Sequence, residues 1–222
     1  MVSYGRKLNK FGSPCPEVYG FVQNSGLLSL CTIGYEVADK GLITAFIERW
    51  HRDTNSFHLP MGEMTITLDD VSSILHIPIM GQFPTYMTLG YDESSSLLVE
   101  LLGVVQTRAN EELRQCRSSY VRLSWLREVY EDSCTGQLWE YGARAFLLHL
   151  VGCTIFADKS ATSISVSYLA LFRDLPVCGG YAWGAAALAY TYEQLGDACF
   201  AHTRQLGGYI TLIQVRLTIN LM

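Results

Sequence analysis

Four side chains that could bind a metal ion or transfer protons crowd into residues 51–63, namely His51, Asp53, His58 and Glu63. Zinc requires three or four such ligands that converge as a tetrahedron. His51 is expected at the end of a helix, whereas His58 and Glu63 stand on either side of a turn, and no HExxH motif is present. We therefore expect solvated or hydrogen-bonded polar residues around a turn, and no metal site.

Other patterns that support catalysis are incomplete. No serine lies in a GxSxG elbow, and no glycine-rich phosphate-binding motif occurs. His149 and Cys153 stand four apart on an apolar segment, which favours core residues, although a cysteine–histidine pair more distant in sequence stays open. Lys159 lies inside the apparent core region without the phosphate-binding groups of a pyridoxal-phosphate enzyme. The sequence thus predicts a non-enzymatic protein without cofactors, and a degenerate enzyme is the least favoured hypothesis.

One segment, residues 108–127, carries a local excess of arginine, and Tyr120 and Trp125 within it could stack on bases. Acidic residues follow directly after this segment, which is typical of a solvated helix face of mixed charge. The net charge of −5 also argues against a generally basic nucleic-acid-binding protein. We keep nucleic-acid binding, or a transposase-accessory role, as the alternative function, with contacts through Arg108, Arg114, Arg117 and Arg122.

The composition is that of a folded, core-rich chain of 222 residues, with 49% hydrophobic and 17% charged residues. Its seven cysteines are scattered, without the paired spacing of zinc ribbons, and suit buried thiols in a reducing compartment such as the cytosol or nucleus. The most apolar stretch, residues 146–157, is too short to span a bilayer. We expect no membrane association and no signal peptide.

The elements that must position these residues begin with a loop-like segment, residues 1–26, which is rich in glycine and proline. An apolar stripe that includes Ile43, Phe46 and Trp50 then predicts a helix. Alternation of apolar residues predicts a β-hairpin near residues 57–68.

A short capped helix is predicted to follow the hairpin. Thr67 stands three residues before Asp70, as in a capping box that uses Asp in place of Glu. Pro78 restricts the residue before it, so the helix should stop near His76, and Gly81 should form a turn. The stretch from the hairpin to Gly81 is therefore expected to be a folding unit.

The remainder of the chain predicts a connecting loop at residues 83–96 and then mostly helices. The helical patterns cover residues 96–105, 108–116, 120–132, 137–157, 164–175 and 180–203. No linker divides the chain, so we predict one mainly α-helical domain with a small β-hairpin.

Three stretches resemble the plant mobile domain, also called the aminotransferase-like plant mobile domain, of the Maintenance of Meristems family and its transposon-borne relatives. They are "FHLPMGEMTITLDDVSSILHIPIMG", "ARAFLLHLVGCTIFADKSATSISVSYLALFRDL" and "YAWGAAALAYTYEQLGDA". The resemblance implies a plant mobile domain over residues 27–222, with a C-terminal end that is truncated or divergent after Gln214. The matching motif or structural residues are His58, Pro60, Gly62, Glu63, Thr67, Asp70, Pro78, Gly81, Arg144, Asp158, Lys159, Trp183 and Gly184.

The same resemblance implies a nuclear, non-enzymatic protein-interaction domain that serves transposon silencing, genome stability and meristem maintenance. It implies a protein partner, including a phosphatase-like protein, and carries over no catalytic residue. Arg144 and Glu63 lie inside apolar or turn motifs, and we expect both to be structural, because buried charges need partners.

Overall fold

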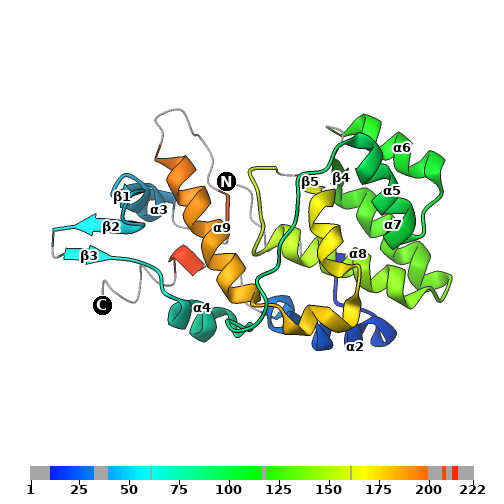
Figure 1. Cartoon of the computed structure of the whole chain (residues 1–222), viewed down its shortest axis with the longest axis horizontal. Helices are drawn as coiled ribbons and strands as arrows, with labels where there is room; N and C mark the ends of the chain where they lie inside the picture. The colour runs from blue at the N-terminus through cyan, green and yellow to red at the C-terminus, as the bar shows by residue number, and fades with distance from the viewer. Residues whose placement is uncertain are drawn as a thin grey trace.

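Helices make up most of the computed structural model, and the strands form only small antiparallel sheets (Figure 1), so the prediction of a mainly α-helical fold is confirmed. The structure describes residues 11–32, 40–60, 62–116, 119–160, 162–199, 207–208 and 212–214. The helices are α2 (Pro16–Asn24), α3 (Lys40–Ile47), α4 (Leu68–Leu75), α5 (Tyr91–Leu102), α6 (Gln106–Gln115), α7 (Leu123–Thr135), α8 (Trp139–Cys153) and α9 (Trp183–Ala198), with 3₁₀ helices η1 (Leu28–Cys31), η2 (Val166–Phe172) and η3 (Leu175–Gly180). The strands are β1 (Trp50–His51), β2 (Ser56–Leu59), β3 (Gly62–Met64), β4 (Tyr120–Arg122) and β5 (Ser163–Ser165).

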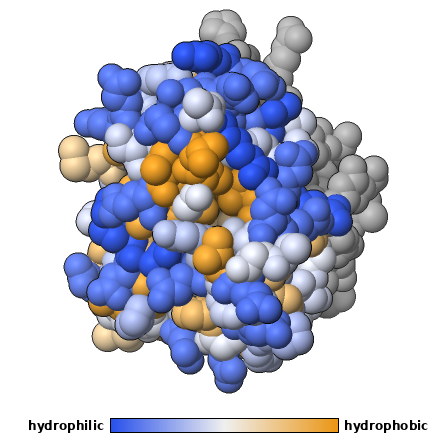
Figure 2. Space-filling model, turned by 90° about the vertical axis from the view of Figure 1, so that its right-hand side faces the viewer, coloured by the Kyte–Doolittle hydropathy of each residue, from blue (hydrophilic) through white to orange (hydrophobic). Residues whose placement is uncertain are grey.

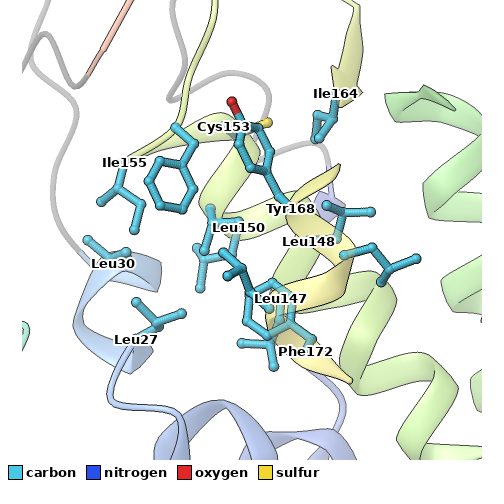
Figure 3. Packing of buried hydrophobic residues seen from close by; sticks show 14 of the residues in the cluster. Leu27, Leu30, Leu147, Leu148, Leu150, Cys153, Ile155, Ile164, Tyr168 and Phe172 are labelled. Carbon is cyan, nitrogen blue, oxygen red and sulfur yellow. The ribbon is translucent and has the colours of Figure 1, made fainter. Parts of the chain in front are cut away.

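Helix α8 forms the centre of the core. All its residues from Ala145 to Cys153 are buried, as expected for a helix that is apolar on every side. Figure 3 shows side chains that converge on it from several elements: Leu27 and Leu30 from the region of η1, and Tyr168 and Phe172 from η2. The predicted helix at residues 137–157 is thus present but ends earlier than expected.

The N-terminal segment contains a helix where we predicted a loop, so that prediction was wrong for α2. Pro16 was read as a helix breaker, but it occupies the first helical turn, where its missing N–H is not needed. Val18 and Val22 are four residues apart and fully buried, and α2 packs against α8. Burial of this stripe outweighs the cost of Gly20, whose position has open space around it. Residues 1–10 lie outside the described part of the chain.

The β-hairpin is present as β2 and β3, with His58 opposite Glu63 in the register. A third strand, β1, pairs with β2 and was not predicted, because Trp50 had been assigned to the preceding helix. Trp50 packs on Phe57 across the strand pair, with ring centroids 4.8 Å apart. The apolar stripe was read correctly as buried, but its last member belongs to the sheet.

The capped helix α4 forms as predicted. The Thr67 hydroxyl accepts from the Asp70 backbone N–H at 3.3 Å, and the Asp70 carboxylate accepts from the Thr67 backbone N–H at 2.7 Å. The helix ends at Leu75, and His76 takes a left-handed conformation with φ of 51°. Pro78 therefore marks the end of the helix as expected.

Three other predictions needed correction. The helix predicted at residues 120–132 begins only at Leu123, because residues 120–122 form β4. The segment predicted as a helix at residues 164–175 forms β5 and then η2, because Ile164 pairs with Val121 of β4. The predicted loop at residues 83–96 is a loop only through Gly90, the N-cap residue of α5, which begins at Tyr91. The Gly90 backbone N–H donates to the Glu93 carboxylate at 2.8 Å, a helix-start signal that sequence analysis missed.

Candidate functional site

The histidines and acids of residues 51–63 do not converge on a common point. The His51 and His58 rings stack face to face, with centroids 4.1 Å apart and an interplanar angle of 11°. His58 Nε2 lies 3.3 Å from Glu63 Oε1, and Ser56 Oγ donates to Glu63 Oε2 at 3.1 Å. The Glu63 side chain is 58% exposed, so the expectation that it is a buried charge was wrong. Within the described residues, no cluster of three or more His, Cys, Asp or Glu side chains could hold a metal ion.

The first and third motif stretches meet where the chain leaves α4. The Gly184 backbone N–H donates to the Pro78 carbonyl at 2.7 Å, at the start of α9. A Cβ atom on Gly184 would lie 2.7 Å from Ile79 Cγ2 and 3.1 Å from Val71 Cγ1. The glycine is therefore needed because two segments that are distant in sequence approach closely at this point.

Gly81 makes a second close approach, at η3. Its φ of +134° favours glycine, and a Cβ atom there would lie 2.3 Å from the Gly180 carbonyl oxygen. Beside it, the Gln82 N–H donates to the Gly180 carbonyl and the Ala182 N–H donates to the Gln82 carbonyl, both at 2.9 Å. Gly81 thus lets the chain pair its backbone with the segment before α9.

Trp183 anchors the same junction from inside. The side chain is fully buried, and its Nε1–H is shared between the carbonyls of Ser25 at 2.9 Å and Cys178 at 3.0 Å. Its ring stacks on Phe172, with centroids 5.7 Å apart. Tryptophan therefore supplies both apolar area and a hydrogen bond to the end of α2, which explains its place in the motif structurally.

Arg144 is the basic residue of α8, and its partners are those of a structural group. Its side chain is 11% exposed. Nε donates to the Phe172 carbonyl at 3.0 Å, and Nη2 donates to the Arg173 carbonyl at 3.3 Å and to Glu140 Oε2 at 3.2 Å. The guanidinium therefore satisfies the carbonyls at the end of η2, where a 3₁₀ helix leaves acceptors unpaired.

Three other motif residues lie at turns. Pro60 is exposed at the tip of the hairpin. The Asp158 carboxylate accepts from the Ser160 N–H at 2.7 Å and so closes the turn after α8. Lys159 Nζ lies 3.9 Å from Asp197 Oδ2, a half-exposed pair that joins this turn to α9. None of these arrangements forms a reactive centre.

Two of the four arginines proposed for nucleic-acid contact, Arg108 and Arg122, are paired with acids. Arg108 Nη1 donates to Asp132 Oδ2 at 2.6 Å, and its guanidinium lies over the Trp125 ring, 5.8 Å from the centroid. Arg114 is exposed on α6. Arg117 lies outside the described residues.

Arg122 forms the most buried ion pair of this region. Its guanidinium binds both oxygens of Glu112, with Nη2 at 2.5 Å from Oε2, and its backbone N–H donates to Oε1 at 2.7 Å. The Glu112 side chain is 1% exposed, whereas that of Arg122 is 43% exposed. The hydrogen bond to Glu112 raises the pKa of Arg122 further. This arginine therefore compensates a buried carboxylate, which is a structural role.

The segment between α4 and α5, residues 77–90, contains no charged residue. We call it the connecting segment; Figure 1 shows it as the long trace that passes from α4 to α5 in front of the helices. Met80 is 81% exposed, Met87 is 79% exposed and Phe83 is 50% exposed. Contiguous apolar side chains in water are a common mark of an interaction surface.

These three side chains are exposed although several contacts hold the connecting segment against the rest of the protein. Besides the backbone bonds at Pro78 and Gln82, the buried Pro84 holds the connecting segment to the surface. The Tyr86 ring packs edge-on against Tyr168, with centroids 4.8 Å apart. The connecting segment is therefore fixed at both ends and in its middle, with the exposed apolar side chains between the fixed points.

The aromatic cluster beneath Tyr86 has no acid–base role at neutral pH. Burial raises the pKa of Tyr168 and Tyr190 well above the usual range, and it also raises the pKa of Tyr86. These phenols stay protonated at physiological pH, so they act as packing groups.

A second apolar area lies at the opposite end of the molecule from the hairpin. Figure 2 shows apolar surface in the middle of that face, ringed by hydrophilic residues. Val105 at the turn between α5 and α6 is 65% exposed, and Leu138 at the turn between α7 and α8 is 51% exposed. A Cβ atom on Gly103 would lie 2.5 Å from the Tyr141 ring, so the two turns adjoin. We call Val105 and Leu138 the end patch.

The described residues thus form a mainly α-helical domain whose motif residues make close contacts between segments, and the most exposed apolar side chains lie in the connecting segment and the end patch. Residues 26–220 match the family model of the plant mobile domain, so the chain belongs to the plant mobile domain family, as the sequence motifs predicted. None of the described helices has the length and apolar character needed to cross a membrane. No solved structure matches the chain.

Curated relatives come from Arabidopsis thaliana. Protein MAIN-LIKE 1 is 38% identical over 201 residues, which cover 89% of this chain and 39% of the relative. Protein MAINTENANCE OF MERISTEMS is also 38% identical, over 89% of this chain and 41% of the relative. A protein named serine/threonine-protein phosphatase 7 long form homolog is 32% identical over 86% of this chain and 14% of its own length. The chain therefore spans about two fifths of the length of the first two relatives.

Proposed function

We propose that this plant mobile domain is a non-enzymatic protein-interaction module of the nucleus, which serves meristem maintenance and transposon silencing through a protein partner. The observation that carries the proposal is the connecting segment. Its uncharged surface presents Met80, Phe83 and Met87 to solvent from a backbone that is fixed at several points. A fixed apolar surface loses little conformational entropy on binding, which favours association.

The partner that we propose first is a phosphatase-like protein. One relative named as a phosphatase homolog contains a segment similar to nearly the whole of this chain. A domain that occurs within a protein named as a phosphatase homolog is a candidate to bind a separate phosphatase-like protein. The chemistry of the connecting segment fits a partner with an apolar groove, because methionine side chains adapt readily to such surfaces.

Co-purification from plant nuclei tests the proposal. A tagged copy of the intact protein should recover a phosphatase-like partner, and the triple variant Met80→Ser, Phe83→Ser, Met87→Ser should lose it. The matched control is Val105→Ser with Leu138→Ser, which removes the end patch and should keep the partner. Loss in the control but not in the triple variant would move the interaction to the end patch, and recovery of no partner by the intact protein would refute the function.

Localisation needs its own measurement. Fluorescence microscopy of the intact tagged protein should place it in the nucleus, and fractionation should agree. Exclusive recovery of the protein from the cytosol would contradict the nuclear role while leaving the interaction surface testable with purified components.

A further inference from the structure

Two cysteines that are 119 residues apart in sequence meet in the structure. Cys15 Sγ lies 3.4 Å from Cys134 Sγ. Both side chains are half-buried, so small molecules can reach them. Because the partners are so far apart in sequence, nothing in the cysteine spacing indicated that they pair.

The surroundings hold the two sulfurs together from both sides. Cys15 is the N-cap residue of α2, and its backbone N–H donates to the Tyr130 hydroxyl of α7 at 2.8 Å. Cys134 lies in the last turn of α7. A Cβ atom on Gly142 of α8 would lie 3.6 Å from Cys134 Sγ and 3.5 Å from Val18, so α2, α7 and α8 adjoin at this point.

We propose that Cys15 and Cys134 form a reversible disulfide that fastens the N-terminal helix α2 to the end of α7. The sulfurs need to close from 3.4 Å to the ~2.05 Å of a disulfide bond, which is within reach of small side-chain rotations. The bond would join α2 covalently to the helical core, to which it is otherwise held by packing and a few hydrogen bonds.

A low-molecular-weight disulfide such as oxidised glutathione supplies the oxidising equivalents. One cysteine thiolate attacks a glutathione sulfur, which forms a mixed disulfide and releases one glutathione thiolate. The second cysteine then attacks the protein sulfur of the mixed disulfide, which forms the Cys15–Cys134 bond and releases the second glutathione. Two protein thiols each lose a proton, each released glutathione takes one up, and two electrons pass to the glutathione disulfide.

The raised pKa of Cys134 slows its attack on glutathione, whereas the short distance between the two sulfurs speeds closure of the bond between them. Burial, together with a hydrogen bond to Cys15, raises the pKa of Cys134 to about 11. A thiol of this kind reacts slowly in a random encounter, but a neighbouring sulfur at contact distance has a high effective concentration. The charge of Glu17 also raises the pKa of Cys134, whereas a hydrogen bond with Tyr130 lowers it in part.

Peptide mapping after oxidation tests the proposal on the intact protein. We expect treatment of the reduced protein with excess oxidised glutathione to give a monomer lacking two hydrogens, with the Cys15 and Cys134 peptides cross-linked. Dithiothreitol should reverse the change. Because the bond restricts the unfolded chain, the oxidised protein should melt roughly 5 to 10 °C higher than the reduced one.

Two variants separate this bond from other thiol chemistry. Cys134→Ser should lose both the cross-link and the rise in melting temperature, whereas Cys199→Ser, which removes an exposed thiol, should keep both. If Cys134→Ser fails to fold, the map of the wild-type protein decides alone. The proposal is overturned if Cys15 and Cys134 both remain alkylatable after oxidation, or if either stops at a stable mixed disulfide. A cross-link without a rise in melting temperature would refute the claim that the disulfide stabilises the attachment of α2 to α7.

Discussion

Helices α6 and α7 carry many charged side chains, whereas the connecting segment between α4 and α5 carries none. In this region, Arg108 of α6 is paired with Asp132 of α7, and Arg122 of β4, directly before α7, is paired with Glu112 of α6. In the connecting segment, apolar side chains that could have been buried are in water. Net charge in a sequence therefore says little about binding until the partners of each charge are known, and exposure of apolar residues says more.

This comparison depends on Arg122 being a structural residue. The variant Arg122→Ala tests that role and has the largest expected effect on stability. Arg122→Ala should lower the free energy of unfolding by about 3 kcal/mol, because Glu112 is 1% exposed and would be left as an uncompensated buried carboxylate. Chemical denaturation of the variant and the wild-type protein measures this loss.

The matched control for that change is Arg114→Ala, in the same helix α6 that carries Glu112. Arg114 is exposed, and its replacement should change the unfolding free energy by no more than about 0.5 kcal/mol. Equal losses in the two variants would mean that Arg122 is an ordinary surface residue, and the nucleic-acid alternative would regain weight.

The next largest loss of unfolding free energy is expected from a change in the backbone of the connecting segment, at Gly81. Gly81→Ala should cost about 2–3 kcal/mol, because a left-handed φ and a contact of 2.3 Å with the Gly180 carbonyl oxygen act together. Gly62→Ala is the matched control, since Gly62 has the same φ of +134° with open space around it. Thermal melts of the two variants isolate the steric part, and equal losses would show that the close approach to η3 does not matter.

Arg144 tests whether a charge inside an apolar helix holds η2 in place. Arg144→Met should cost about 2 kcal/mol, because its hydrogen bonds to the Phe172 and Arg173 carbonyls are lost. Arg127→Met is the control. Its ion pair with Glu131 is about half exposed and is expected to contribute roughly 0.5 kcal/mol or less. Unchanged melting of the Arg144 variant would contradict its structural role.

Sequence reasoning predicted best where the signal was local. The capping box of Thr67 and Asp70 and the stop before Pro78 depend on neighbours in the chain, and both are present. Helix α2 and strand β1 were missed because tertiary burial, of Val18 and Trp50 respectively, decided the outcome against local propensity.

The candidate surfaces were harder to predict than the fold. Nothing in the sequence distinguishes Met80, which is exposed, from Ile77, which is buried. The pairing of Arg122 with Glu112 was equally invisible, since it requires β4 to pass beside α6. The motif glycines Gly81 and Gly184 could be recognised from the family pattern, but the close approaches that explain them join segments about a hundred residues apart.

The smallest expected effect concerns the exposed side chains themselves. Met80→Ser, Phe83→Ser and Met87→Ser should each change the unfolding free energy by no more than about 0.5 kcal/mol, because these side chains are at least half exposed. Tyr86→Ser in the same segment should cost about 1–2 kcal/mol, because Tyr86 packs on Tyr168 and Phe156.

Denaturation of the four single variants separates the side chains that hold the connecting segment from those that it presents. A serine at Met80, Phe83 or Met87 that destabilised the protein as much as Tyr86→Ser would assign that side chain to the fold. The contrast with α6 and α7 would then fail, because the apolar side chains of the connecting segment would stabilise the fold just as the paired arginines of the α6–α7 region do. Loss of partner binding without loss of stability is the combination that an interaction surface requires, because a residue kept for packing cannot be removed at no cost to folding.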